Sequence, residues 1–282
     1  MESIRDLRIR IKSIQNTRQI TESMRLIATR KVLKTRQRME ENRPYLRQYH
    51  EVISSLQKNP AFSSNAYIAG REPTNSLIIL ITGDRGLCSG YNVNASKHGR
   101  ALGRKLQGAR FITIGKKGND FLRRRRKQIV KSFRGISENP FYEDALSIAE
   151  YAIELYDKKE VDQVYVAYTK YNSMLNLEPS TAKLLPLERT EGAEADLLTR
   201  YDSDGERFAD YAIKNYVTTV LFGAMLESAV CEQAARVIGM DTASKNCDKI
   251  IETLTLRYNQ MRQSAITQEI AEIVGGAQMS GS

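Results

Sequence analysis

The sequence predicts an α/β domain flanked by two long helices, and three observations support this fold class. All six prolines lie between residues 44 and 186, so the first 43 and the last 96 residues contain no strong helix breaker. Both proline-free ends carry apolar residues at alternating spacings of three and four, as paired helices do. Between them, short apolar runs alternate with amphipathic stretches, which is typical of βαβ units and a largely parallel sheet.

The N-terminal helix is predicted from a seam of three- and four-residue spacings between Ile4 and Leu56. Eleven of its sixteen positions are apolar, which is typical of a coiled coil. The seam lapses at three polar positions, where we expect an adjacent apolar stripe to replace it: Arg18, Thr21 and Arg25 give way to Ile20, Met24 and Ile27. Pro44 predicts a kink or a short irregularity in this helix.

A second seam predicts the C-terminal helix. It runs from Val217 to Ile238 through small residues that permit close packing, blurs over residues 239–246, and resumes from Cys247 to Ala265. Gly275 and Gly276 are expected to end it. Two seams at opposite ends of one chain most simply pair with each other, antiparallel. The C-terminal helix is the longer of the two, so its excess must be solvated or covered by another protein.

The central region is expected to form five strands and three helices. The strands are predicted at residues 77–81, 110–114, 129–133, 161–169 and 181–187, and the helices at residues 94–107, 118–123 and 142–157. Residues 63–73 and 188–204 are predicted to be loops. The expected organisation is an N-terminal coiled-coil helix at 1–58, a Rossmann-like α/β domain at 74–190 and a C-terminal coiled-coil helix at 207–277.

The net charge of +10 is unevenly distributed. Residues 1–47 carry thirteen Lys and Arg against five acidic residues, a balance of +8, so the other 235 residues carry +2. A positive helix that must be covered favours an acidic protein surface or nucleic acid as its partner. Its basic residues are interleaved along the seam, unlike the block that precedes a leucine zipper in DNA-binding proteins. The run from Arg123 to Lys127 is interpreted as a solvated helix end.

The residue types exclude several kinds of site. Three scattered cysteines, Cys88, Cys231 and Cys247, have no metal or redox spacing and are expected to be buried. Two isolated histidines argue against a His-based zinc site and a Ser-His-Asp triad. The sequence contains no run of 18 apolar residues, so no membrane-spanning helix is predicted. We therefore assign no catalytic, cofactor-binding or metal-binding residue, and a scaffold or transmission role is favoured over catalysis.

One glycine-rich turn, from Gly83 to Gly90, follows the strongest predicted strand. Such turns can hold phosphate groups, but these glycines stand three and four residues apart with no lysine after them. That spacing fits neither the dinucleotide fingerprint nor the P-loop, so a structural tight turn is favoured. Two other classes stay open on the residues alone: a coiled-coil adaptor or nucleic-acid-binding scaffold, and a nucleotide-binding enzyme that uses this turn.

Four motifs, in order along the chain, resemble the gamma subunits of rotary F-type ATP synthases. They are IQNTRQITESM at 14–24, TGDRGLCSGYN at 82–92, EQAAR at 232–236 and YNQMRQSAITQEI at 258–270. Two departures are small: Gly83 stands where Ser or Thr is common, and Ser89 replaces the first glycine of a usual pair. The chain lacks the regulatory insertion of chloroplast members and a clear transit sequence, so it resembles the bacterial members.

The resemblance implies a central-stalk rotor that has no catalytic activity and no cofactor of its own. The C-terminal end of its coiled coil would turn inside three alpha and three beta subunits, which bind ATP and Mg²⁺. The α/β domain would sit with the epsilon subunit on the membrane ring of c subunits, peripheral to the cytoplasmic face of a bacterial cell membrane. Rotation would couple ion flow to ATP synthesis or hydrolysis and regulate ATPase activity and proton flow, with no nucleic acid as partner.

The resemblance also implies roles for individual residues. Contact with beta subunits is expected at six positions, with Met24 beside an acidic lever and Arg236 supporting the shaft: Met24, Arg236, Arg262, Gln263, Thr267 and Glu269. Three residues would lie in the apolar bearing of the alpha/beta head: Ile266, Ile270 and Ile273. Tyr201 and Asp202 match the foot that meets the c ring.

Overall fold

The structure is a computed structural model that describes residues 3–188 and 205–280. The chain divides into two compact units, one made of Met1–Ile27 with Val237–Ser282 and the other of Ala28–Arg236. The helices α1 (Ile4–Lys58) and α6 (Gly205–Ser280) contribute to both. Among the described residues, no helix is long and apolar enough to cross a membrane.

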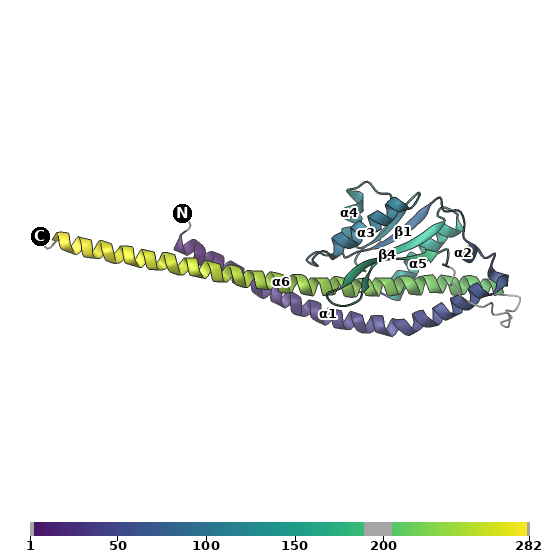
Figure 1. Cartoon of the computed structure of the whole chain (residues 1–282), viewed down its shortest axis with the longest axis horizontal. Coiled ribbons are helices and arrows are strands. Elements are labelled where there is room, and N and C mark those ends of the chain that lie inside the picture. Colours follow the sequence, from purple (N-terminus) through teal and green to yellow (C-terminus); the bar gives the residue numbers. More distant parts are fainter. Residues whose placement is uncertain (1–2, 189–204, 281–282) are drawn as a thin grey trace. The chain divides into compact units, whose positions relative to one another are not determined.

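The larger unit contains a five-stranded sheet in the order β3-β2-β1-β4-β5. Two of its strands, β1 and β4, are labelled in Figure 1. The strands are β1 (Ser76–Ile81), β2 (Arg110–Ile114), β3 (Ile129–Phe133), β4 (Gln163–Tyr171) and β5 (Leu177–Leu185). The first four are parallel and β5 is antiparallel to β4. The helices between them are α3 (Tyr91–Lys105), α4 (Lys116–Arg123) and α5 (Tyr142–Asp157). The predicted, largely parallel α/β sheet is confirmed.

The side chains of β1 show how the sheet separates two cores. Leu77, Ile79 and Ile81 pack on one face with residues of α5 and α6, while Ile78 and Leu80 pack on the other with residues of α3 and α4. All six residues of β1 are buried, as expected for a central parallel strand covered on both faces. Helices α3 and α4 therefore form a separate outer layer on the face of the sheet opposite α5 and α6.

Several predicted boundaries differ from the structure. The fourth and fifth strands lie a few residues from their predicted positions, and the expected loop 63–73 contains a short helix, α2 (Ala66–Ala69), capped by the side chain of Asn65. Helix α1 runs through Pro44, and α6 continues past Gly275 and Gly276 to Ser280. Each glycine costs a helix only about 1 kcal/mol, so two of them are not a sufficient stop signal. Residues 189–204 lie outside the described chain.

The apolar seam predicted for α1 is confirmed by burial. Every buried residue of the helix occupies a seam position: Leu7, Ala28, Val32, Thr35, Met39, Ile53 and Leu56. The replacement stripe is wrong, because Ile20 and Ile27 are 60% and 58% exposed. Polar contacts hold this stretch instead. Arg18 forms an ion pair with Asp248 of α6, and the Thr21 hydroxyl lies 3.4 Å from that of Ser244.

The two long helices run antiparallel in each unit. In the smaller unit, Arg8 donates to the hydroxyl of Tyr258 at 2.8 Å, and Arg18 pairs with Asp248. Moving forward along α1 from Arg8 to Arg18 corresponds to moving back by the same number of residues along α6. In the larger unit, a Cβ atom at Gly223 would lie 3.0 Å from Cδ1 of Leu46, and the rings of His50 and Tyr216 lie with their centroids 6.5 Å apart. Moving forward along α1 from Leu46 to His50 therefore again corresponds to moving back along α6. The antiparallel coiled coil predicted from the two seams is thereby confirmed.

Candidate functional site

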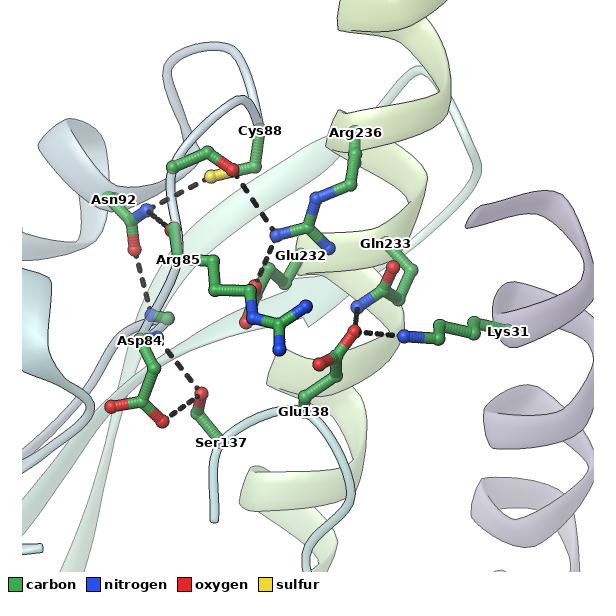
Figure 2. A network of polar contacts seen from close by, with 12 residues as sticks. Lys31, Asp84, Arg85, Cys88, Asn92, Ser137, Glu138, Glu232, Gln233 and Arg236 are labelled. Atoms are coloured by element: carbon green, nitrogen blue, oxygen red, sulfur yellow. Dashed lines mark hydrogen bonds and ion pairs between the residues drawn. The ribbon is translucent and has the colours of Figure 1, made fainter. Parts of the chain in front are cut away.

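The polar groups of the glycine-rich turn after β1, residues 83–90, form hydrogen bonds with other parts of the same chain (Figure 2). The backbone amide of Gly83 donates to Oδ1 of Asn92 at 2.8 Å, and the side-chain amide of Asn92 donates to the carbonyl oxygen of Arg85 at 3.0 Å. The carboxylate of Asp84 accepts from two backbone amides, one at the start of α4 and one just after β3, both at 2.9 Å. The turn is thus tied to α3, α4 and the segment after β3, which is the geometry of a structural tight turn.

A buried ion pair on α6 faces this turn. Nη2 of Arg236 lies 2.6 Å from Oε1 of Glu232, and the two side chains are 8% and 2% exposed. The same Arg236 nitrogen donates to the carbonyl oxygen of Gly86 at 3.4 Å. Burial raises the pKa of the Glu232 carboxyl, and Arg236 opposes part of that effect. The pair therefore connects α6 to the turn in an environment that penalises charge.

Gly83 leaves the space that the Glu232 carboxyl occupies. A Cβ atom at position 83 would lie 2.7 Å from Cδ and 2.8 Å from Oε2 of Glu232, closer than real side chains approach. That Oε2 atom is buried and has no hydrogen-bond partner among the described residues. Gly83, which stands where related sequences commonly have Ser or Thr, is therefore a point at which the turn directly contacts α6.

The segment between β3 and α5, residues 134–141, joins α1 to α6; we call it the clamp segment. Within it, Oε1 of Glu138 forms an ion pair with Lys31 of α1 and accepts from Nε2 of Gln233 of α6 at 3.2 Å (Figure 2). Burial tends to raise the pKa of Glu138, but the bond and charge of Lys31, together with the charges of Arg85 and Arg236, outweigh it, and the pKa is lowered. One carboxylate thus bridges both long helices.

A second contact of the clamp segment lies farther along α1. The guanidinium of Arg38 donates to Oδ1 of Asn139 at 2.7 Å and to the carbonyl oxygen of Pro140 at 2.6 Å. It also lies over the ring of Phe141, 5.7 Å from the centroid. Because Arg38 is two turns beyond Lys31, the clamp segment contacts α1 along one continuous face.

In the smaller unit, Met24 lies on the surface of the helix pair. It is half-buried and lines a shallow groove of about 510 Å³ along α1, together with five neighbours: Asn16, Gln19, Ile20, Ser23 and Ile27. Exposed apolar and amide side chains thus gather around the predicted contact residue. The stripe of Ile20, Met24 and Ile27, which was expected to replace the seam against α6, therefore lines a groove on the surface instead.

The predicted contact and bearing residues near the end of α6 are exposed. Arg262, Gln263, Thr267 and Glu269 all lie on the surface, and the exposed fractions of Ile266, Ile270 and Ile273 are 47%, 56% and 71%. Helix α1 begins at Ile4, so in the register set by Arg8 and Tyr258 it offers no described residue beyond about position 262 of α6. The apolar side chains there have no cover within the described chain.

The remaining predicted residues have different surroundings. Arg236 is buried in its pair with Glu232. It differs in this from Arg262, Gln263, Thr267 and Glu269, which were assigned to the same beta subunits and are exposed. Tyr201 and Asp202 lie outside the described residues. Sequence reasoning missed Lys31 and Glu138, because no local pattern distinguishes them from other surface charges. The EQAAR motif and the unusual Gly83 were visible signals of the contact at the turn.

Comparison with known proteins identifies the family. The family model described as ATP synthase matches residues 3–279. The ATP synthase gamma chain of Alkaliphilus metalliredigens is 38% identical, and the sodium-ion-specific ATP synthase gamma chain of Acetobacterium woodii is 36% identical; each match covers 98% of both chains. The chain belongs to the ATP synthase gamma-chain family.

Solved structures share the fold of this gamma-family chain. A chain of the Euglena gracilis mitochondrial ATP synthase superposes with a TM-score of 0.71 at 16% identity, over 98% of this chain and 93% of that one. A chain of the Tetrahymena thermophila central stalk and c-ring gives 0.61 at 23% identity, over 80% of this chain and 99% of that one. At these identities the likeness concerns the architecture of helix pair and sheet.

Proposed function

We propose that this gamma-family chain is the central-stalk rotor of an F-type ATP synthase. It would turn with the c ring and the epsilon subunit inside a head of three alpha and three beta subunits, at the cytoplasmic face of the membrane. The catalytic sites would belong to the head, so this chain would transmit rotation without reacting. In doing so it would couple ion flow to ATP synthesis or hydrolysis, and it would regulate ATPase activity and proton flow.

The full-length family match is the observation that carries the proposal, and three structural features support it. The antiparallel helices provide a stiff element. The end of α6 exposes Ile266, Ile270 and Ile273, which suits a surrounding apolar sleeve. Arg262, Gln263, Thr267 and Glu269 are exposed beside them, where a loop of one beta subunit could reach them.

Other assigned residues take narrower roles in the proposal. Met24 would lie beside the acidic lever of a beta subunit, where the positive charge of α1 supplies a screened attraction that is small for each exposed pair. Arg236 would act from inside the chain, by holding α6 to the turn at Gly86, and so support the shaft. Tyr201 and Asp202 are proposed as the foot on the c ring.

Assembly and coupling test this function together. The tagged chain should replace the gamma subunit in a strain that lacks its own and co-purify with alpha and beta subunits in a ratio of one to three to three. Membrane vesicles containing that complex should pump ions when given ATP. A chain that folds but never joins alpha and beta subunits would refute the proposal, and saturable ATP binding by the free chain would favour a nucleotide-binding enzyme.

A further inference from the structure

The outer layer of the α/β domain carries the densest charge in the sequence. Residues 91–134 contain fourteen Lys and Arg and a single acidic residue, Asp120, a net charge of +13. Eleven of the fourteen belong to α3, to α4 and to the turn after α4: Lys97, Arg100, Arg104, Lys105, Lys116, Lys117 and residues 123–127. We call all fourteen the basic layer.

Within the described chain, this positive charge is hardly neutralised. Of the fourteen side chains, only Arg110 has a carboxylate within 4 Å among the described residues, that of Glu160 at 3.6 Å. Burial, followed by the charges of Arg104 and Arg125, lowers the pKa of Arg100. The positive groups of α3 and α4 therefore repel one another, and an external anion would relieve that repulsion.

The surface around these charges limits the kind of partner. Between residues 91 and 134, the one large apolar side chain that is exposed is Val93, at 47%, so the basic layer offers no cluster of apolar side chains that could anchor a permanent interface or enter a lipid bilayer. It also lacks exposed aromatic rings on which single-stranded nucleic acid could stack. Eight of the fourteen residues are arginines, whose planar groups pair with carboxylates through two parallel hydrogen bonds.

We propose that the basic layer is a docking surface for a protein that presents a dense acidic face. Eleven of its residues lie on α3, on α4 and in the turn after α4, and these helices cover the face of the sheet opposite α5 and α6, so the helix pair leaves them accessible. Lys131 of β3 instead lies over the ring of Tyr151 of α5, 4.1 Å from its centroid. The proposal rests on the proposed function in one respect: in an assembled synthase, other protein subunits are the nearest source of many carboxylates. A contact made by charge without an apolar centre forms and releases quickly, which suits a subunit that moves past or adjusts against its neighbour.

Carbodiimide cross-linking of the assembled, membrane-bound enzyme tests the contact. The reagent joins a lysine amine to a carboxylate that touches it, so Lys97, Lys105 and Lys127 should become linked to Asp or Glu of another subunit. The linked fraction should fall when salt is raised from about 0.1 M to about 1 M, because the screening length shrinks from roughly 10 Å to 3 Å.

Variants then assign the contact to charge. The triple change Arg123→Gln, Arg124→Gln and Arg126→Gln should lower the linked fraction by about tenfold. The matched control Lys159→Gln, Lys170→Gln and Lys183→Gln removes three charges elsewhere on the same domain and should leave it unchanged. Circular dichroism and thermal unfolding would show that both triple variants fold.

Three results would overturn the inference. The first is a fully assembled enzyme in which none of the three lysines links to another subunit, which would leave the rotor function intact and remove only the docking surface. The second is an equal loss of cross-links in the control variant. The third is flotation of the full chain with vesicles of phosphatidylglycerol and phosphatidylcholine that the triple arginine change abolishes, which would assign the layer to a lipid surface.

Discussion

At position 83, the absence of a side chain determines how closely the glycine-rich turn approaches α6. The Glu232 carboxyl fills the space where a Cβ atom would stand, and Arg236 holds that carboxyl from the next helical turn. A buried pair of this kind contributes more to a unique arrangement than to net stability, because desolvation offsets much of its attraction. The missing Cβ atom of Gly83 and the position of the Glu232 carboxyl thus set the geometry of this contact.

Replacing Gly83 tests that close approach. Gly83→Ala should lower the free energy of unfolding by about 1–3 kcal/mol, because the added methyl group must displace the Glu232 carboxyl. Gly86→Ala in the same turn is the matched control, since its nearest neighbour would lie 3.9 Å away. Urea unfolding of the full chain measures both. Equal stability of the two variants would contradict the contact.

The protonation of Glu232 gives a second test. Its pKa is raised above the ordinary value of 4.5 by burial, so the folded chain holds this proton more tightly than the unfolded chain does. The contribution of Glu232 to stability must then fall as the pH rises from that value through the raised folded-state pKa. A glutamine at this position does not titrate.

Glu232→Gln should therefore gain stability relative to the parent chain as the pH rises above about 4.5, until the carboxyl of the folded parent chain is also ionised. Any constant cost of weakening the bond to Arg236 would appear equally at each pH. Urea titrations at several pH values measure the difference, with the exposed Glu150→Gln as control. A difference that stays flat, or that shrinks with rising pH, would show that the Glu232 pKa is not raised.

At the scale of elements, the clamp segment connects parts that are distant in sequence. Glu138 bonds to Lys31 of α1 and to Gln233 of α6, and Arg38 secures the far end of the same segment. The helix pair is also held by side-chain packing along its seam and, in the smaller unit, by direct polar contacts such as that of Arg18 with Asp248. A short segment between β3 and α5 thereby attaches the α/β domain to both long helices through directional bonds.

Removing the shared carboxylate should weaken this attachment. Glu138→Ala leaves Lys31 without its ion pair and Gln233 without its acceptor, and we expect a loss of about 1–2 kcal/mol in the free energy of unfolding. Glu150→Ala on α5 removes an exposed carboxylate and should change stability by less than about 0.5 kcal/mol. If Glu138→Ala proved as stable as this control in urea, the clamp contacts would be energetically unimportant.

At the scale of the whole molecule, charge is separated into regions of opposite sign. Residues 1–47 carry +8 and residues 91–134 carry +13, so the rest of the chain carries −11. Interpreting the net +10 mainly as a property of the first helix was incomplete, because the acidic remainder concealed the second positive region. Two separated positive surfaces fit a subunit that meets more than one acidic partner, with contacts that weaken as salt rises.

The rotor proposal makes its own prediction for the assembled enzyme. A rotor transmits torque through helix stiffness and steric contact, so Arg262→Ala or Gln263→Ala should lower ion pumping per ATP hydrolysed while hydrolysis continues. Gln260→Ala, also exposed on α6, is the control. Simultaneous assays of ATP hydrolysis and vesicle acidification measure the ratio. Complete loss of hydrolysis in a normally assembled complex would contradict a transmission role for these residues.

Much of the fold was predictable from the sequence because its signals are local. The seam of α1, the strands at 110–114 and 129–133 and the helix at 142–157 follow from the spacing of apolar residues, which the backbone geometry of helices and strands imposes. Boundaries that depend on weaker signals were less accurate. The glycines at 275 and 276 disfavour a helix without ending it, and the seam at Arg18 stays in register because α6 supplies Asp248 opposite.

The polar network and the two faces of the sheet required tertiary structure. Gly83 and Glu232, or Lys31 and Glu138, are far apart in the chain, and no periodicity relates them. Only the packed fold brings their atoms together, and at Glu232 it does so where burial strengthens each bond and penalises an unpaired charge. Likewise, the basic residues of α3 and α4 were visible in the sequence, but only the stacking of both helices on one face of the sheet brings them to the same side of the domain.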